Sequence, residues 1–130
     1  MSEFRWDPLK NNWAIIAKGQ NRRPQDFLQQ RELVEISSCP FCNGNESKTP
    51  SEVYAHRPDG SGLNQTGWQV RVIPNKFPAL RIEGELDNQA EGLYDRMNGV
   101  GAHEVIIETP NHQECLGDLS VEQIAEVLKA

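Results

Sequence analysis

The sequence predicts an α+β domain in which short strands alternate with loops and one amphipathic helix comes last. Its hydrophobic residues fall into short runs that are separated by segments rich in Gly, Pro, Ser and Asn. The run at 68–73 alternates apolar and polar side chains, as a strand with one buried face does. Residues 121–128 place apolar side chains at helical spacing behind Ser120, and Gln123 stands at the capping-box distance from that serine.

Each predicted strand is a short apolar run bounded by residues that interrupt a strand. Asn, Gly and Pro residues stand at these boundaries, and proline cannot donate a hydrogen bond to a sheet. In the second run, Trp68, Val70 and Val72 share one face. The predicted strands are 13–17, 68–73 with a continuation at 79–82, and 103–109. The segments 20–30 and 45–67 are predicted loops, and the acidic, Gly-containing segment 83–101 is predicted to be exposed.

Length and charge exclude several classes of protein. The chain has 130 residues, the size of one ordinary domain, so 1–130 is predicted to be a single domain. Its 19 acidic and 13 basic residues give a net charge of −6, which argues against a nucleic-acid partner. No apolar run approaches the roughly 20 residues of a membrane span, and the N-terminus lacks the apolar region of a signal peptide. With only three cysteines, a cytoplasmic protein is the expectation.

The sharpest local motif is the cysteine pair in Cys39-Pro40-Phe41-Cys42. A Cys-x-x-Cys turn lets two thiolates converge on one metal ion, and zinc accepts them at about 2.3 Å. A redox pair of the thioredoxin type is one alternative, but such a pair opens a helix, and the following residues NGNESKTPSE do not predict one. Two ordinary thiols are the other alternative. The spacing favours a zinc knuckle.

A structural zinc needs four ligands, so further candidates must lie elsewhere. His112 and Cys115 follow the predicted strand end at Pro110, in a loop that can reach a neighbouring knuckle. Together they would complete a Cys3His set, which favours them over His56 and His103.

Five segments occur in an order that resembles a known family. They are WDPLKNNWAIIA, NRRPQDF, CPFCNGNE, WQVRVIPNKFPAL and HEVIIETPNH. Together they resemble the N-terminal half of the galactose-1-phosphate uridylyltransferases, enzymes of the histidine-triad superfamily whose relatives include the ADP-glucose phosphorylases. The resemblance implies an antiparallel sheet with helices packed on it, incomplete at the C-terminal end of this chain. It also implies a homodimer.

The resemblance implies a nucleotidyl transfer in galactose metabolism. In this family a histidine of a His-x-His motif attacks the α-phosphorus of UDP-glucose, releases the sugar 1-phosphate and holds the nucleotide covalently. Galactose 1-phosphate then accepts the nucleotide. No His-x-His motif occurs in these 130 residues, so we expect a truncated N-terminal piece that is inactive alone.

Two alternative functions stay open. An ADP-glucose phosphorylase would move AMP from ADP-glucose to phosphate with the same family machinery. A non-catalytic zinc-knuckle module would bind nucleotides or a protein partner. A downstream His-x-His segment is required by either enzyme and is irrelevant to the module.

The family's metal ligands map onto Cys39, Cys42 and His112. Zinc is the expected metal, with iron as the alternative. The fourth family ligand is the first histidine of the catalytic motif, which lies beyond this sequence. Cys115 is therefore not implied as a ligand by the resemblance.

The family's nucleotide contacts map onto two other segments. Asn75 resembles the residue that contacts base and ribose, and Lys76 lies beside it. Arg23 resembles an arginine that meets phosphate. Many relatives carry an additional arginine where this chain has Gln20, and an amide cannot replace a bidentate guanidinium. Arg22 is the candidate to compensate.

Overall fold

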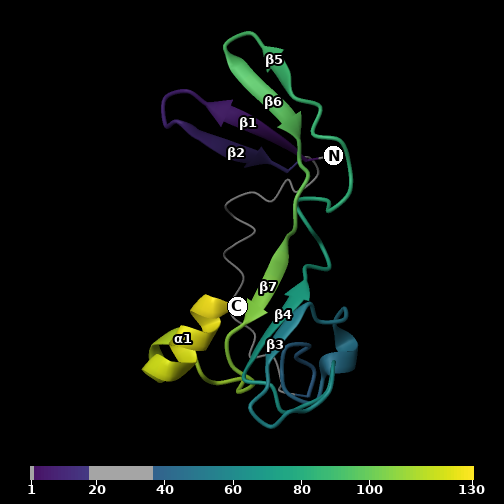
Figure 1. Cartoon of the computed structure of the whole chain (residues 1–130), viewed down its shortest axis with the longest axis vertical. Helices are drawn as coiled ribbons and strands as arrows, with labels where there is room; N and C mark the ends of the chain where they lie inside the picture. The colour runs from purple at the N-terminus through teal and green to yellow at the C-terminus, as the bar shows by residue number, and fades with distance from the viewer. Residues whose placement is uncertain (1, 18–36) are drawn as a thin grey trace. The chain divides into compact units, whose positions relative to one another are not determined.

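The structure is a computed structural model that describes residues 2–17 and 37–130, and it divides into two compact units (Figure 1). The first unit comprises Met1–Arg31 and Phe77–His103. The second unit comprises Glu32–Lys76 and Glu104–Ala130. Each unit is built around one antiparallel sheet.

The first unit contains a four-stranded sheet in the order β2-β1-β6-β5. Its chain begins with a hairpin whose turn is set by Asp7, since that carboxylate accepts hydrogen bonds from the backbone N–H groups of Leu9 and Lys10 at 3.0 and 3.2 Å. A second hairpin turns at Gly92, where φ is +64° and glycine is favoured. The strands are β1 (Glu3–Asp7), β2 (Asn12–Ile16), β5 (Gln89–Glu91) and β6 (Tyr94–Asn98).

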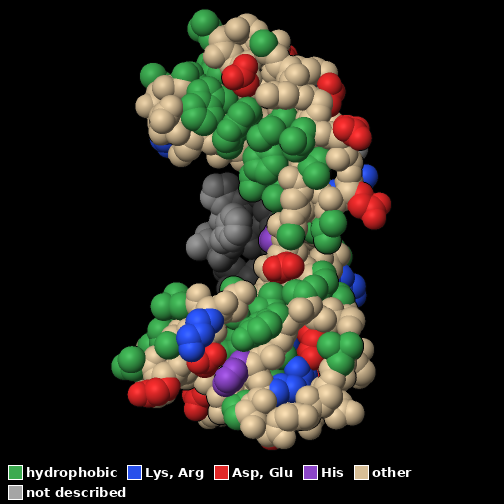
Figure 2. Space-filling model, in the orientation of Figure 1, with side chains coloured by type: hydrophobic (Ala, Val, Ile, Leu, Met, Phe, Trp, Pro, Cys, Tyr) green, Lys and Arg blue, Asp and Glu red, His purple; other side chains and the backbone are tan. Residues whose placement is uncertain are grey.

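One face of this sheet carries a cluster of aromatic side chains. The register places Trp6 opposite Trp13 and Phe4 opposite Ile15. The rings of Trp6 and Trp13 pack edge to face with centroids 5.5 Å apart, and those of Phe4 and Trp13 with centroids 6.5 Å apart. Met97 of β6 pairs with Phe4 and extends the same face. Figure 2 shows hydrophobic side chains gathered over this sheet.

The second unit contains a three-stranded sheet in the order β3-β4-β7, with a helix after its last strand. Its apolar core consists of Trp68, Ile73 and Ile107, which are 2–8% exposed. The elements are the 3₁₀ turn η2 (Glu46–Lys48), the strands β3 (Tyr54–His56), β4 (Val70–Pro74) and β7 (Glu104–Ile107), the 3₁₀ turn η3 (Leu116–Asp118) and the helix α1 (Val121–Lys129).

The central strand β4 is buried on both faces, and the face that carries the core residue Ile73 also carries a buried ion pair. Arg71 is 1% exposed and donates to the Glu52 carboxylate at 2.7 Å. Arg57 also pairs with Glu52, at 2.7 Å, and the backbone N–H of Asn64 donates to it at 2.9 Å. These bonds attach the loop between β3 and β4 to the sheet, because a buried carboxylate needs all its acceptor sites filled.

The helix α1 begins as the sequence predicts. Ser120 is its N-cap, and its hydroxyl accepts a hydrogen bond from the backbone N–H of Gln123 at 3.2 Å. The Gln123 side chain donates to the carbonyls of Gln69 and Glu108, at 2.8 Å each. Glu126 adds a contact to the β3 residue His56 at 3.4 Å. These polar contacts fix the helix against the sheet.

The α+β prediction is confirmed in part. Antiparallel pairing and the strands at 13–17, 68–73 and 103–109 are found with shifted ends. The expected set of packed helices is wrong, since α1 is the single α-helix among residues 2–17 and 37–130. Residues 79–82 form no strand, because the Ala79 N–H donates to His103 and Arg81 makes only an isolated bridge.

Four strands lie outside the predicted set. The segment 83–101, which was predicted to be exposed, contains the β5–β6 hairpin. The predicted loop 45–67 contains β3, and β1 lies at Glu3–Asp7, where no strand was predicted. In the part of the chain that the structure describes, no helix is long and apolar enough to traverse a lipid bilayer.

The buried ion pair makes the second unit sensitive to acid. Burial alone would raise the pKa of Glu52, but hydrogen bonds from Arg57, Asn64 and Arg71 lower it below its ordinary 4.5. Because the folded-state pKa is depressed, Glu52 stabilises the fold fully above pH 4.5, and this contribution is lost as the pH falls below that value.

We predict that Glu52→Ala lowers the free energy of unfolding by roughly 3–5 kcal/mol at pH 7, because Arg71 is left buried and unpaired. The difference from the native chain should shrink as the pH falls below 4.5. Denaturant unfolding monitored by circular dichroism measures it, with the exposed Glu85→Ala as control. An equal loss of unfolding free energy in the two variants at pH 7 would contradict the assignment of Glu52 as the stabilising partner of Arg71.

Candidate metal centre

The cysteine pair lies in a compact turn at residues 39–45. The backbone N–H of Cys42 donates to the Cys39 carbonyl at 3.4 Å, and that of Asn45 donates to the Cys42 carbonyl at 3.1 Å. The Asn45 side chain closes the turn by donating to the Cys39 carbonyl at 2.8 Å. Gly44 has φ +91°, which a residue with a Cβ rarely adopts. This turn has the form of the knuckle that the sequence predicts.

His112 reaches the knuckle from the segment after β7. Thr109 organises this segment, since its hydroxyl donates to Glu114 at 2.8 Å and accepts from the Asn111 N–H at 3.2 Å. The side chain of Asn111 in turn accepts from the Gln113 N–H at 3.3 Å. Because His112 follows β7 closely, the pairing of β4 with β7 determines where His112 lies.

The structure brings the three predicted metal ligands together. The ligand atoms of Cys39, Cys42 and His112 all lie within 4.8 Å of one another. Cys42 Sγ and His112 Nδ1 are 3.0 Å apart. Zinc–sulfur and zinc–nitrogen bonds of usual length at a tetrahedral angle separate such donors by about 3.5 Å. Two thiolates and one imidazole are the donors that zinc prefers, so the residues fit this metal.

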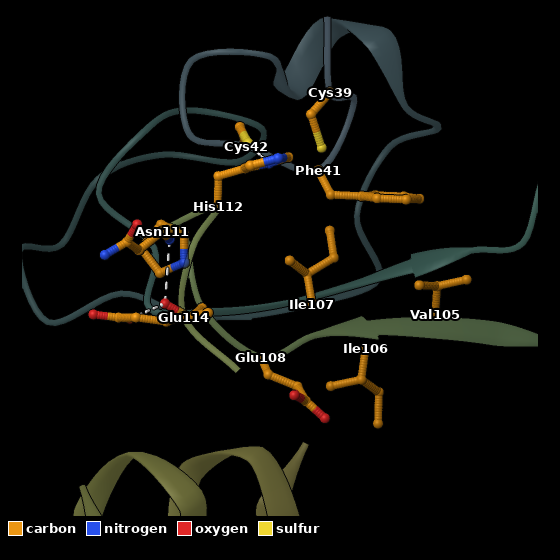
Figure 3. Close-up of a pocket in the computed structure, with 12 residues that line it drawn as sticks. Cys39, Phe41, Cys42, Val105, Ile106, Ile107, Glu108, Asn111, His112 and Glu114 are labelled. Atoms are coloured by element: carbon orange, nitrogen blue, oxygen red, sulfur yellow. Dashed lines mark hydrogen bonds between the residues drawn. The ribbon is translucent and has the colours of Figure 1, made fainter. Parts of the chain in front are cut away.

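A cavity of about 280 Å³ adjoins the three side chains. Figure 3 shows Cys39 and Phe41 extending from the knuckle toward Ile107 of β7, with His112 beside Cys42. The rest of the cavity wall is formed by Val105, Ile106, Glu108, Thr109, Pro110, Asn111 and Glu114. The cluster thus lies at the rim of a mainly apolar pocket within the second unit.

Two ionisable groups near the knuckle have shifted pKa values. Burial raises the pKa of the Cys42 thiol, which is 4% exposed, and the neighbouring Cys39 raises it further. At Glu46 burial would raise the pKa as well, but hydrogen bonds from the Trp68 indole and backbone N–H groups lower it below its usual value. Glu46 is therefore an anion at neutral pH, close to the turn.

The other histidines and Cys115 lie outside this cluster. His56 faces Glu126 at 3.4 Å, and His103 belongs to the first unit, where its Nδ1 accepts from the Ala79 N–H at 2.8 Å. Cys115 is exposed and its thiol donates to Asp118 at 3.0 Å. The described residues thus offer Cys39, Cys42 and His112 as one group of possible ligands.

The predicted nucleotide-contacting residues are not brought to the metal cluster. Asn75 and Lys76 directly follow β4, beside the start of β7, because Pro74 pairs with Glu104. His112 follows the opposite end of β7. Arg22 and Arg23 lie outside the described residues, as does Gln20.

Sequence reasoning missed the residues that support the knuckle. The Glu46 carboxylate accepts hydrogen bonds from the Gly44 N–H at 3.1 Å and from the Trp68 indole at 2.8 Å. Glu46 stands at the end of the CPFCNGNE segment, and nothing in this polar stretch of sequence predicts that its side chain is buried. Trp68, which the sequence places on one face of a predicted strand, is 2% exposed.

Two of the three thiols, those of Cys42 and Cys115, should differ in reactivity when no metal is present. We predict that iodoacetamide modifies the exposed Cys115 before the buried Cys42, because the thiolate is the nucleophile and burial raises the pKa of Cys42. Peptide mass mapping after chelator treatment measures the order. Urea-unfolded protein, in which the accessibility difference vanishes, is the control. Faster modification of Cys42 in the folded protein would refute the prediction.

No protein-family model matches the chain, but individual relatives do. An ADP-glucose phosphorylase of Arabidopsis thaliana is 35% identical over 133 residues, covering 98% of this chain and 36% of the relative. A galactose-1-phosphate uridylyltransferase of Thermotoga maritima is 23% identical over 130 residues, covering 99% of this chain and 34% of the relative. The chain thus spans about a third of the length of these curated relatives.

Solved structures match over the same extent. The crystal structure of an Arabidopsis thaliana ADP-glucose phosphorylase with bound ADP-glucose superposes with a TM-score of 0.55 at 33% identity, covering 98% of this chain and 35% of that one. A uridylyltransferase structure matches with a TM-score of 0.52 at 26% identity, covering 98% and 32%. The chain therefore belongs to the galactose-1-phosphate uridylyltransferase and ADP-glucose phosphorylase family of the histidine-triad superfamily, and corresponds to the N-terminal portion of its members.

Proposed function

We propose that this chain is the zinc-bearing and nucleotide-contacting part of a nucleotidyltransferase that acts on ADP-glucose. The observation that carries the proposal is the convergence of Cys39, Cys42 and His112 from two distant segments. The 35% identity to an ADP-glucose phosphorylase supports adenylyl transfer over the uridylyl transfer first expected. Transfer between UDP-glucose and galactose 1-phosphate is the second candidate, supported by the matches to uridylyltransferases.

The proposed zinc is structural. Its two cysteines come from the loop before β3 and its histidine from the segment after β7, so the ion would join segments 70 residues apart. A structural zinc has four protein ligands, and the fourth is proposed to be a histidine of the catalytic motif outside these 130 residues. Iron is the alternative metal at the same residues.

The proposed nucleotide site uses residues other than the metal ligands. Asn75 offers an amide for the base or ribose, and Lys76 offers a positive charge for phosphate. Arg22 and Arg23 are proposed to meet the phosphates, because guanidinium groups match phosphate oxygens in a bidentate way.

The proposed reaction runs in two displacements. A histidine from the remainder of the enzyme attacks the α-phosphorus of ADP-glucose, and the bond to glucose 1-phosphate breaks. The adenylyl-histidine is then attacked by inorganic phosphate, which releases ADP and restores the histidine. The cationic side chains of this chain would stabilise the charge on the transferring group. A homodimer and a cytoplasmic location remain part of the proposal.

Zinc binding should depend on all three clustered residues. We predict that Cys42→Ser and His112→Ala each weaken zinc affinity by at least roughly 100-fold, because loss of a direct ligand exceeds the usual effect of outer residues. Cys115→Ser, whose thiol lies outside the cluster, should bind zinc as the native chain does. Competition titration with a chromophoric chelator measures the affinities. Native affinity in His112→Ala, or a loss in Cys115→Ser, would contradict the assignment.

The nucleotide can be identified by trapping the covalent intermediate. We predict that the protein expressed from its complete natural reading frame gains the mass of AMP after incubation with ADP-glucose, and that added phosphate removes this mass. Intact-protein mass spectrometry measures it.

A UMP adduct from UDP-glucose, without an AMP adduct, would move the function to uridylyl transfer. No adduct with either nucleotide, in a folded and zinc-loaded protein, would favour the non-catalytic binding module. Asn75→Ala should reduce the rate of adduct formation and leave the zinc content unchanged.

A further inference from the structure

Two buried side chains connect the cysteine knuckle to the strand pair that carries His112. Glu46 is 7% exposed and Trp68 is 2% exposed. One carboxylate oxygen of Glu46 accepts both the Gly44 N–H, at 3.1 Å, and the Trp68 indole N–H, at 2.8 Å. Gly44 follows Cys42 by two residues, so the hydrogen bond from Gly44 to Glu46 fixes the backbone just after the second cysteine of the knuckle.

Trp68 connects this carboxylate to the histidine side of the centre. It lies two residues before β4 and packs in the core with Ile73 of β4 and Ile107 of β7. Ile107 is the last residue of β7, and His112 follows in the next turn. The path from the cysteines to the histidine therefore runs through one hydrogen-bonded carboxylate and one buried indole.

We propose that Glu46 and Trp68 are positioning residues for the metal centre, fixing the direction of the Cys42 sulfur relative to the His112 imidazole. This inference rests on the proposed metal site. Residues behind the direct ligands of a metal orient those ligands and typically change metal affinity by roughly 10–100-fold when removed. Neither side chain lies among the clustered ligand atoms, so each acts through the fold.

A second buried glutamate provides a matched control. Glu52 is 6% exposed, and its carboxylate also accepts several hydrogen bonds. The donors are Arg57, Asn64 and Arg71. Those donors make no hydrogen bond to the Glu46 carboxylate, and the network reaches Glu46 through its backbone, because Arg71 donates to Thr49 and the Thr49 hydroxyl donates to the Glu46 carbonyl. Loss of the Glu52 carboxylate should therefore lower stability without changing the metal geometry.

The test uses cobalt(II) in place of zinc, because its visible absorption reports the geometry and the thiolate ligands. We expect Glu46→Ala to bind cobalt roughly 10–100-fold more weakly than the native chain and to give an altered ligand-field band at saturation. Trp68→Phe keeps an aromatic ring in the core but removes the indole N–H, and should show a smaller change of the same kind. Glu46→Gln retains a carbonyl oxygen at this place and should restore the native band. Glu52→Gln should give the native band.

The outcomes separate this inference from the metal proposal. If the native chain binds neither cobalt nor zinc, both are wrong. If the native chain binds cobalt and both Glu46→Ala and Trp68→Phe show its affinity and band, the positioning role is wrong and the metal site stands. If Glu52→Gln alters the band as Glu46→Ala does, the effect is general loosening and the positioning role is again wrong. Should Glu46→Ala fail to fold by circular dichroism, Trp68→Phe and Glu46→Gln decide.

Discussion

The antiparallel pairing of β4 with β7 is the constraint on which the rest of the second unit depends. It places Arg71 opposite Ile107 and Pro74 opposite Glu104. A slip by one residue would turn every side chain of β7 to the other face of the sheet. Ile107 would then leave the core beside Trp68, and the segment that carries His112 would start from the wrong face. The metal cluster is therefore a consequence of strand register.

Polar bonds contribute much of what holds this unit together. Its described apolar core consists mainly of Trp68, Ile73 and Ile107, which is small for a unit with long loops. Two buried carboxylates add to this core. Glu46 attaches the knuckle to Trp68, and Glu52 attaches the loop between β3 and β4 to the sheet. A fully satisfied buried network specifies one arrangement of the loops, whereas a partly satisfied one is costly. A structural metal would add a further cross-link of the kind that small cores need.

The sequence predicts the grouping of Cys39, Cys42 and His112, and it predicts part of the fold. The Cys-x-x-Cys spacing and the position of His112 after a strand indicate the cluster directly, because metal ligands must be particular residue types. The start of α1 is equally readable from Ser120 and Gln123. The β5–β6 hairpin was missed because its strands are short and polar, and the pairing of β6 with β1 depends on residues about 90 positions away.

The support of the site is not readable from the sequence alone. Glu46 looks like a solvated residue of a polar loop, and its burial follows only from the position of Trp68 in three dimensions. Arg71 interrupts an apolar strand as an outward-facing residue would, but it is buried against Glu52. In both cases a charged group is buried because its partner comes from a distant segment, and periodicity does not report such partners.

X-ray absorption at the zinc edge of the zinc-loaded chain tests the central claim most directly. If Cys39, Cys42 and His112 hold the ion, the spectrum contains two sulfur neighbours at about 2.3 Å and a nitrogen neighbour with imidazole scattering at about 2.0–2.1 Å. A first shell of oxygen and nitrogen without sulfur would contradict it, because the knuckle would then not be the place where the metal binds.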